Sequence, residues 1–334
     1  MARALIAAAI LVAPVTLHAE DGASTVPFVT SRNISDGEGP SAFFGDERSG
    51  LSAGWCVVDR LDAAALDPVL DTAPAFLREH LLGVDRVEVL DQTLARDALL
   101  DAVRPASPAL FVHGYFIDFD KGCRRASMLQ TNAGLEGRLL WFSWPSDGDI
   151  ASYARDEADL YWSVLDLADV IIELNAATAT GERVDVLGHS LGARGVTLAL
   201  YEIAFREPTI RLGHIVLLAP DVDFEIFARL LPRITPIVES ITVYVTDEDR
   251  PLALSKQLHG YSRLGQAGNE VTALSGVEVI DVSAIPNESA SGHLYHIHNS
   301  RVGDDLRILL DEGLLASERP NLEQTGANTW SLQN

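Results

Sequence analysis

Hydrophobic residues form short runs that alternate along the chain with longer amphipathic segments. Runs rich in β-branched and other apolar residues predict eight strands, at 55–59, 86–90, 109–114, 139–144, 183–188, 214–220, 240–246 and 277–283. Between them, segments such as 149–174 carry apolar residues three and four positions apart, which is the spacing of a helix with one buried face. Strands that are apolar on both faces need helices on both sides of the sheet. We therefore predict one α/β domain of three layers, with a mostly parallel eight-stranded sheet.

The two ends of the chain differ in composition from this alternating region. Residues 1–19 hold one arginine and then an apolar run that ends at Ala19 before two acidic residues, a pattern typical of a secretory signal peptide. An uncleaved membrane anchor is the alternative. Residues 20–42 are rich in Asp, Gly, Ser and Pro and predict a flexible arm, followed by the domain at 43–316 and a C-terminal tail at 317–334. We expect a periplasmic or secreted protein, cleaved near Ala19.

The charge of the chain narrows its partners. With 48 acidic and 25 basic residues the formal net charge is −23, which repels nucleic acids and anionic membrane surfaces. No apolar stretch after the leader approaches the length of a membrane span, so we expect no stable membrane insertion once the leader is removed. The sequence indicates no oligomeric state.

Cysteine content excludes two further classes of protein. The chain contains Cys56 and Cys123 alone, too few for a disulfide-dense scaffold or a four-cysteine zinc site. In an oxidising compartment the two could pair, and two buried free thiols are the alternative. The sequence does not show whether their Cα atoms lie within bonding range.

A nucleophile motif follows the predicted strand at 183–188. This strand runs into Gly188-His189-Ser190-Leu191-Gly192 and then into a helical pattern, which is the GxSxG nucleophile elbow in its strand-turn-helix context. The turn is so tight that side chains at the two glycine positions would collide with the neighbouring strand or helix. A glycine-rich turn with an idle serine is the alternative. We expect Ser190 to be the nucleophile.

A serine hydroxyl is a weak nucleophile and needs a base. In proteins with this elbow the base follows the last strand, and here the predicted strand at 277–283 is followed by His293, His296 and His298. His293 comes first and has a glycine before it, so we expect it to be the base. His296 and His298 are expected to pack or to meet solvent. Their spacing could also present imidazoles to zinc, but no HExxH motif accompanies them, and we expect neither a metal nor a cofactor.

The acid that orients the base is expected after the preceding strand. Asp247 and Asp249 both follow the predicted strand at 240–246. We favour Asp249, which could reach from the loop while Asp247 caps the turn. Asp221 and Asp223, one strand earlier, are the competing acids.

Donors for the oxyanion are expected at another strand end. The predicted strand at 109–114 ends in His113 and Gly114, and such a turn lets the N–H of Tyr115 point at the oxyanion together with the N–H of Leu191. His113 is expected to be a structural hydrogen-bonding residue rather than the base.

These motifs resemble the α/β-hydrolase superfamily, and more closely a bacterial branch of α/β hydrolases of unknown function (domain of unknown function 900). The resemblance covers roughly residues 43 to 312. The shared segments are FFGDERSGLSAGWCVVD (43–59), FVHGY (111–115), FSWPSDGDIASYARDE (142–157), LGHSLGAR (187–194), APDVD (219–223) and DRPLALS (249–255). In that branch a Gly-His pair followed by an aromatic residue precedes the terminal helix, which corresponds to Gly292, His293 and Tyr295.

Together these features predict a serine hydrolase that cleaves an ester or related acyl bond of a small-molecule substrate, in the manner of a carboxylesterase or lipase. Ser190 attacks, His293 moves the proton and Asp249 orients it, through an acyl-enzyme intermediate. A peptidase, an amidase or an acyltransferase with the same triad remains open. The alternative from another class is a non-catalytic envelope binding protein on the same fold.

Overall fold

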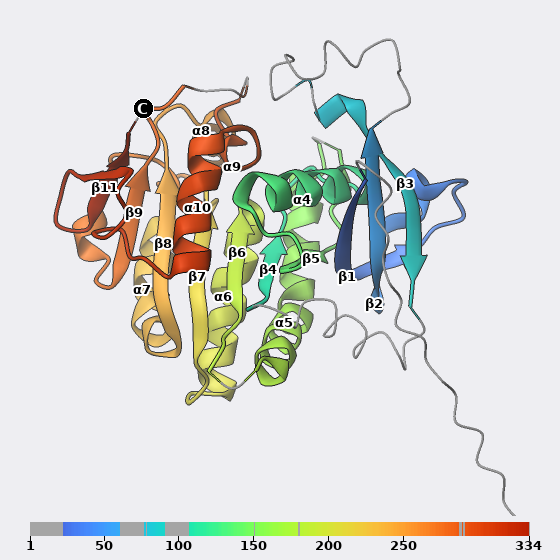
Figure 1. The fold of residues 1–334 in the computed structure, drawn as a ribbon, viewed down its shortest axis with the longest axis horizontal. Coiled ribbons are helices and arrows are strands. Elements are labelled where there is room, and N and C mark those ends of the chain that lie inside the picture. The colour runs from blue at the N-terminus through green and yellow to red at the C-terminus, as the bar shows by residue number, and fades with distance from the viewer. Residues whose placement is uncertain are drawn as a thin grey trace, which may run out of the picture.

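The computed structural model describes residues 23–60, 77, 79–90, 107–149, 151–179, 181–286, 289 and 291–333. The signal peptide predicted at 1–19 lies outside the described residues. The strands are β1 (Ser24–Ile34), β2 (Phe44–Arg60), β3 (Leu82–Val89), β4 (Ala109–Val112), β5 (Leu139–Ser143), β6 (Asp185–His189), β7 (Leu212–Leu218), β8 (Val238–Val245), β9 (Val277–Asp281), β10 (Leu322–Gln324) and β11 (Thr329–Leu332). They form one sheet in the order β10-β11-β9-β8-β7-β6-β4-β5-β1-β2-β3 (Figure 1).

The sheet is parallel through its centre and antiparallel at its two edges. Parallel pairing runs without interruption from β1 through β5, β4, β6, β7, β8 and β9 to β11. The pairs β1–β2, β2–β3 and β10–β11 are antiparallel. The predicted α/β class and mostly parallel sheet are therefore confirmed, and each of the eight predicted strands is present. The predicted number of strands is wrong, because the sheet has eleven.

The additional strands come from the segments expected to be an arm and a tail. Residues 24–34 form β1, with Val26 and Phe28 fully buried, so the flexible arm predicted at 20–42 is wrong over this stretch. The reason is that β1 is covered on both faces, so its polar residues lie inside the sheet beside the apolar ones. Trp330 and Leu332 of β11 are buried in the same way within the predicted tail. The domain therefore extends beyond 43–316 on both sides.

Helices cover both faces of this sheet, as predicted. They are α4 (Phe119–Ala133), α5 (Tyr153–Ala177), α6 (Leu191–Arg206), α7 (Phe224–Ile234), α8 (Arg250–His259), α9 (Tyr295–His298) and α10 (Ser300–Glu312). Short 3-10 helices occur at Pro40–Ala42, Glu79–Leu81, Thr235–Ile237 and Val271–Ala273. Side chains of α5, α6 and α7 fill one hydrophobic cluster, and those of α4, α9 and α10 fill the other. Figure 1 shows α4 and α10 on one side of the sheet.

The strand β4 shows why the central strands are apolar throughout. Leu110 and Val112 belong to the cluster under α5 and α6, whereas Ala109 and Phe111 belong to the cluster under α4 and α10. Successive side chains of a strand point to opposite faces, so a strand buried on both sides needs an apolar residue at each position. No helix in the described part of the chain is long and apolar enough to cross a membrane.

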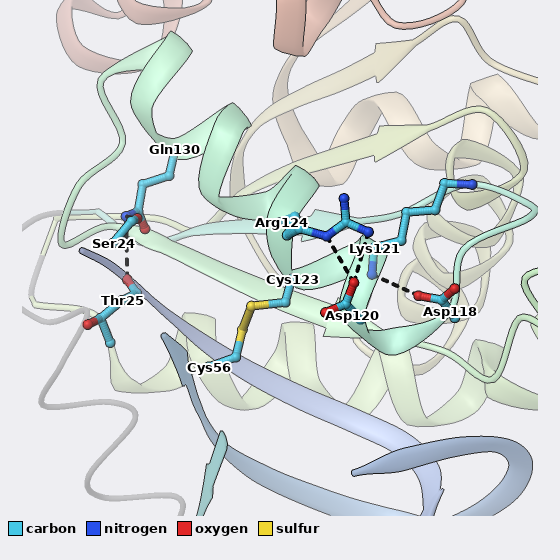
Figure 2. The surroundings of a disulfide bond; sticks show 9 residues. All are labelled: Ser24, Thr25, Cys56, Asp118, Asp120, Lys121, Cys123, Arg124 and Gln130. Carbon is cyan, nitrogen blue, oxygen red and sulfur yellow. Dashed lines mark hydrogen bonds and ion pairs between the residues drawn. A yellow bond between two sulfur atoms is a disulfide. The ribbon is translucent and has the colours of Figure 1, made fainter. Parts of the chain in front are cut away.

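A disulfide joins the N-terminal edge of the sheet to a central helix. Cys56 of β2 and Cys123 of α4 are bonded, and both are fully buried. Figure 2 shows the bond reaching from β2 to α4. Of the two possibilities that the sequence left open, the structure has the paired one.

Removing this disulfide should destabilise the fold, because the bond closes a loop with a sequence separation of 67 residues. We expect the double variant Cys56→Ala, Cys123→Ala to lose about 3 kcal/mol of unfolding free energy, mainly through the larger freedom of its unfolded chain. Urea unfolding of the two proteins measures the difference. The wild type treated with dithiothreitol should lose a similar amount, and equal midpoints for oxidised and reduced protein would contradict the expectation.

Candidate active site

Ser190 lies at a strained turn between β6 and α6. Its backbone has φ 53° and ψ −120°, a conformation that costs a non-glycine residue free energy. Its N–H donates to the carbonyl of Leu218 at 3.0 Å, and its own carbonyl accepts from the N–H of Asp221 at 3.0 Å. These two hydrogen bonds tie the turn to the end of β7 and hold the strained conformation.

Three glycines around Ser190 are required by close contacts. A β-carbon at Gly188 would lie 2.7 Å from Cα of Ala193, and one at Gly192 would lie 2.2 Å from the carbonyl oxygen of His113. A β-carbon at Gly114 would lie 2.9 Å from Cβ of Ser190. The contacts at Gly188 and Gly192 are the collisions expected of an elbow. The contacts at Gly192 and Gly114 show that the turn after β4 packs directly against the turn after β6.

Strained residues gather at the carboxyl ends of the central strands. Phe116, Ser190 and Ala219 all have positive φ, at 65°, 53° and 44°, and they follow β4, β6 and β7 respectively. These strands are neighbours in the sheet. Ligands of open α/β sheets bind outside this edge, and backbone strain is typical of functional sites.

The turn after β4 is held by His113. Its Nδ1–H donates to the carbonyl of Gly114 at 2.8 Å, and the indole N–H of Trp144 donates to the carbonyl of His113 at 2.8 Å. The two rings stack with centroids 5.0 Å apart. Burial, followed by the charge of Arg32, lowers the pKa of His113 to about 3, so the ring is neutral near pH 7. These contacts fit the structural role expected for His113.

The two residues expected to donate to the oxyanion lie on either side of the contact between the turns after β4 and β6. Leu191 is the first residue of α6, where backbone N–H groups have no partner within the helix. Tyr115 follows Gly114, its ring lies 5.1 Å from that of Tyr153, and its hydroxyl donates to the carbonyl of Asp149 at 3.3 Å.

The segment around Trp144 holds the rest of the loop after β4. The N–H of Ile117 donates to Oγ of Ser146 at 3.0 Å, and the N–H of Phe116 donates to Oδ2 of Asp156 at 3.3 Å. Ser146 and Asp156 are buried and hydrogen-bonded to each other. Sequence reasoning assigned no role to these side chains, although the tryptophan-containing segment stood out as a shared motif.

His293 and Asp249 are brought together. Nδ1 of His293 lies 2.6 Å from Oδ2 of Asp249, and the two side chains are 11% and 1% exposed. The other carboxylate oxygen of Asp249 accepts from the N–H of Leu252 at 2.9 Å and caps α8. Since the carboxylate accepts, Nδ1 carries the proton, which leaves Nε2 of His293 free to take one.

The competing acids lie elsewhere. Asp247 is exposed, and its backbone N–H donates to Oγ of Ser283 at 3.1 Å. Asp223 caps α7 by accepting from the N–H groups of Glu225 and Ile226. Neither of these described aspartates has a hydrogen bond to His293.

Asp221 is buried in a network of its own. Its carboxylate accepts from the hydroxyls of Ser255 and Tyr153, each at 2.6 Å, and lies 3.4 Å from the guanidinium of Arg194. Burial alone would raise the pKa of Asp221, but Arg194 and the hydrogen bonds outweigh burial and lower it. The carboxylate of Asp221 therefore supports the region behind the elbow, and its backbone N–H holds Ser190.

Two residues that sequence reasoning did not assign anchor the segment of His293. Nε2–H of His189 donates to the carbonyl of His293 at 3.1 Å. The hydroxyl of Tyr295 donates to the carbonyl of Tyr244 at 3.1 Å and accepts from the N–H of Ala219 at 2.7 Å. In the sequence, His189 could be noticed as the residue between the glycine and the serine of the elbow, and Tyr295 as the aromatic residue two positions after His293.

His296 and His298 belong to the helix α9, and both are buried. Of the two expectations, packing or contact with solvent, the structure has packing. The ring of His296 lies 4.2 Å from that of His189. Burial, followed by the charge of His293, lowers the pKa of His296 well below its usual value. Among the residues that the structure describes, no group of three or more His, Cys, Asp or Glu side chains is arranged to hold a metal ion.

Comparison with known proteins places the chain among hydrolases. A family described as alpha/beta hydrolase of unknown function (DUF900) matches residues 97–311. No curated protein matches the chain significantly. The chain is similar to a solved structure of a predicted CIB-like hydrolase from Thermoplasma acidophilum, at 17% identity over 68% of this chain and 89% of that one, with a TM-score of 0.35.

Two further solved structures are similar to the chain. An esterase from Pyrobaculum calidifontis is 15% identical over 61% of this chain and 77% of that one, with a TM-score of 0.36. The lin2722 gene product of Listeria innocua is 12% identical over 68% of this chain and 99% of that one, with a TM-score of 0.39.

Acid should destabilise the fold through its buried histidines. The pKa values of His113, His189 and His296 are lowered from 6.5, so below pH 6.5 the unfolded chain binds protons that the folded chain does not. Stability is then lost as the pH falls, by about 1 kcal/mol per histidine for each unit below 6.5. Urea unfolding at pH 7.5 and 5.5 measures the loss. It should be about 1 kcal/mol smaller in His296→Gln, and an equal loss in both proteins would contradict the attribution.

Proposed function

Because the chain belongs to the family of alpha/beta hydrolases of unknown function, we propose that it is a serine hydrolase that cleaves an ester or related acyl bond through Ser190, His293 and Asp249. The observation that carries the proposal is the hydrogen bond of 2.6 Å between His293 and Asp249, from a segment that is itself bonded to the residue before Ser190. An acid after β8, a base after β9 and a strained serine after β6 of the same sheet are the parts that acyl transfer needs.

The reaction follows from the positions of these groups. Oγ of Ser190 attacks the substrate carbonyl while Nε2 of His293 takes its proton, and Asp249 stabilises the imidazolium that forms. N–H groups of Leu191 and Tyr115 stabilise the oxyanion. His293 then gives its proton to the leaving group. Water, activated by the same imidazole, releases the acid and restores Ser190, and the cycle uses no cofactor.

An ester of a small molecule is the substrate class that we propose. Peptidases, amidases and acyltransferases use the same three groups, so the triad alone does not separate these activities. The hydrogen-bonded acid and base favour catalysis over a non-catalytic binding protein, because binding alone needs no proton acceptor.

A periplasmic or secreted location is part of the proposal. The composition of residues 1–19 supports it, and so does the disulfide between Cys56 and Cys123, because such bonds persist in oxidising compartments.

A fluorophosphonate probe should label the protein at Ser190, since such probes react with serines activated by a base and an oxyanion site. Hydrolysis of p-nitrophenyl acetate should fall at least about 10⁴-fold in Ser190→Ala, as in other triad removals. Gel fluorescence and release of p-nitrophenol measure the two effects. Unchanged labelling of Ser190→Ala, or a folded wild type that the probe never labels, would favour the binding protein.

Matched variants of two buried histidines test the assignment of the base. His293→Gln should lower hydrolysis by several orders of magnitude because the proton has no acceptor. His296→Gln, the same change at a buried histidine three residues further along the chain, should lower it less than about 10-fold. EDTA should leave the rate unchanged. Equal losses in the two variants, or loss with EDTA and recovery with zinc, would overturn the assignment.

Expression of the full chain should give a shortened product. Signal peptidase is expected to cut near Ala19, so that the exported protein begins near Glu20. Intact-mass measurement on the periplasmic fraction checks this. A product found in the cytosol that retains the leader would show that the location is wrong.

A further inference from the structure

His189 occupies the position between Gly188 and Ser190 in the elbow and is 5% exposed. Its Nε2 lies 3.1 Å from the carbonyl oxygen of His293. A carbonyl only accepts, so Nε2 carries the proton and the ring is held in one tautomer. The hydrogen bond therefore joins the residue before the nucleophile to the backbone of the base, across 104 positions of the chain.

The surroundings of the ring fix its position. The rings of His293 and His296 both lie close to it, with centroids 4.6 Å and 4.2 Å away. On its other edge the backbone of Gly114 is so close that a β-carbon there would lie 3.0 Å from Nδ1 of His189. One side chain thus touches the elbow's neighbouring turn and the base segment together.

The imidazole of His189 is also neutral near pH 7. Burial is the main cause, followed by the nearby rings of His296 and His293, and together they lower the pKa of His189 well below its usual value. A neutral donor adds no charge beside His293, so it can fix the position of that residue without opposing the positive charge that forms on it during the reaction.

We propose that His189 is a positioning residue, which sets the distance between His293 and Ser190 by hydrogen-bonding to the backbone carbonyl of His293. Asp249 accepts from Nδ1 and so fixes the rotation of the imidazole, whereas the bond from His189 reaches the backbone of residue 293 from the elbow. Misplacement of a catalytic group by about 1 Å costs up to about 100-fold in rate. The inference rests on the proposed function, because it assigns His189 a part in the same reaction.

The first test compares a variant that loses the donor with one that keeps it. His189→Leu fills the space without an N–H, whereas the side-chain amide of His189→Gln can donate from a comparable position. With p-nitrophenyl acetate we expect kcat to fall about 10- to 100-fold in His189→Leu, KM to stay within about 3-fold, and His189→Gln to recover most of the loss. An unchanged kcat in His189→Leu would overturn the proposal.

The second test asks whether His189 acts through the base. In a His293→Gln background the backbone carbonyl remains but the base is gone, so His189→Leu should lower the residual rate by less than about 2-fold. The same 10- to 100-fold loss in both backgrounds would show that His189 supports the elbow in general, which contradicts the proposal. His296→Leu, which replaces another buried ring beside that of His189, serves as the control for lost packing.

If His189→Leu does not fold, His189→Asn takes its place, since its shorter amide does not reach the carbonyl of residue 293. A slow Asn variant beside an active Gln variant would support the proposal, and equal activity in both would overturn it. Failure of the proposed function is a separate result: it would appear as a wild type that Ser190→Ala does not impair, whatever the variants of His189 do.

Discussion

The contact between the turns after β4 and β6 is the constraint on which the rest of the site depends. A β-carbon at Gly192 would lie 2.2 Å from the carbonyl oxygen of His113, and one at Gly114 would lie 2.9 Å from Cβ of Ser190. Such close spacing is possible only with glycine at these two positions. It brings the start of α6 beside the loop that carries Tyr115. Ser190 has its strained backbone conformation at this contact, and hydrogen bonds with Leu218 and Asp221 hold it there.

Around this contact, buried polar side chains hold the backbone of the neighbouring loops by hydrogen bonds. Trp144 and Ser146 bind the loop after β4, and His189 binds the segment of His293. Each partner is buried, so the bonds do not compete with water. Asp249 combines two tasks, because one oxygen caps α8 while the other accepts from the imidazole. A helix cap thereby fixes the orientation of the proposed base.

The N-terminal strands help to hold the loop after β4. Arg32 of β1 is almost completely buried and donates to the carbonyls of Ile117 and Ser146, at 2.7 Å and 2.9 Å. Burial lowers the pKa of Arg32 to about 10, so it remains a cation near neutral pH. The disulfide joins β2, the neighbour of β1, covalently to α4, the helix that follows the loop after β4. The strand β1 therefore helps to support the loop that carries the expected oxyanion donor Tyr115.

The sequence by itself determined the eight strands and the elbow, because each depends on neighbours along the chain: an apolar run, or a glycine two places from a serine. The order of serine, acid and histidine was predicted from their places after strands of the sheet. The sequence did not determine that β1 joins the sheet, since Pro27 and several polar residues hide its pattern and its burial comes from α4 and β5. Nor did it place one aspartate against His293, since it favoured Asp249 but left Asp221 open, and it gave His189 no partner. Only the tertiary structure decided these points, because each depends on the distance between atoms that belong to segments far apart in the chain.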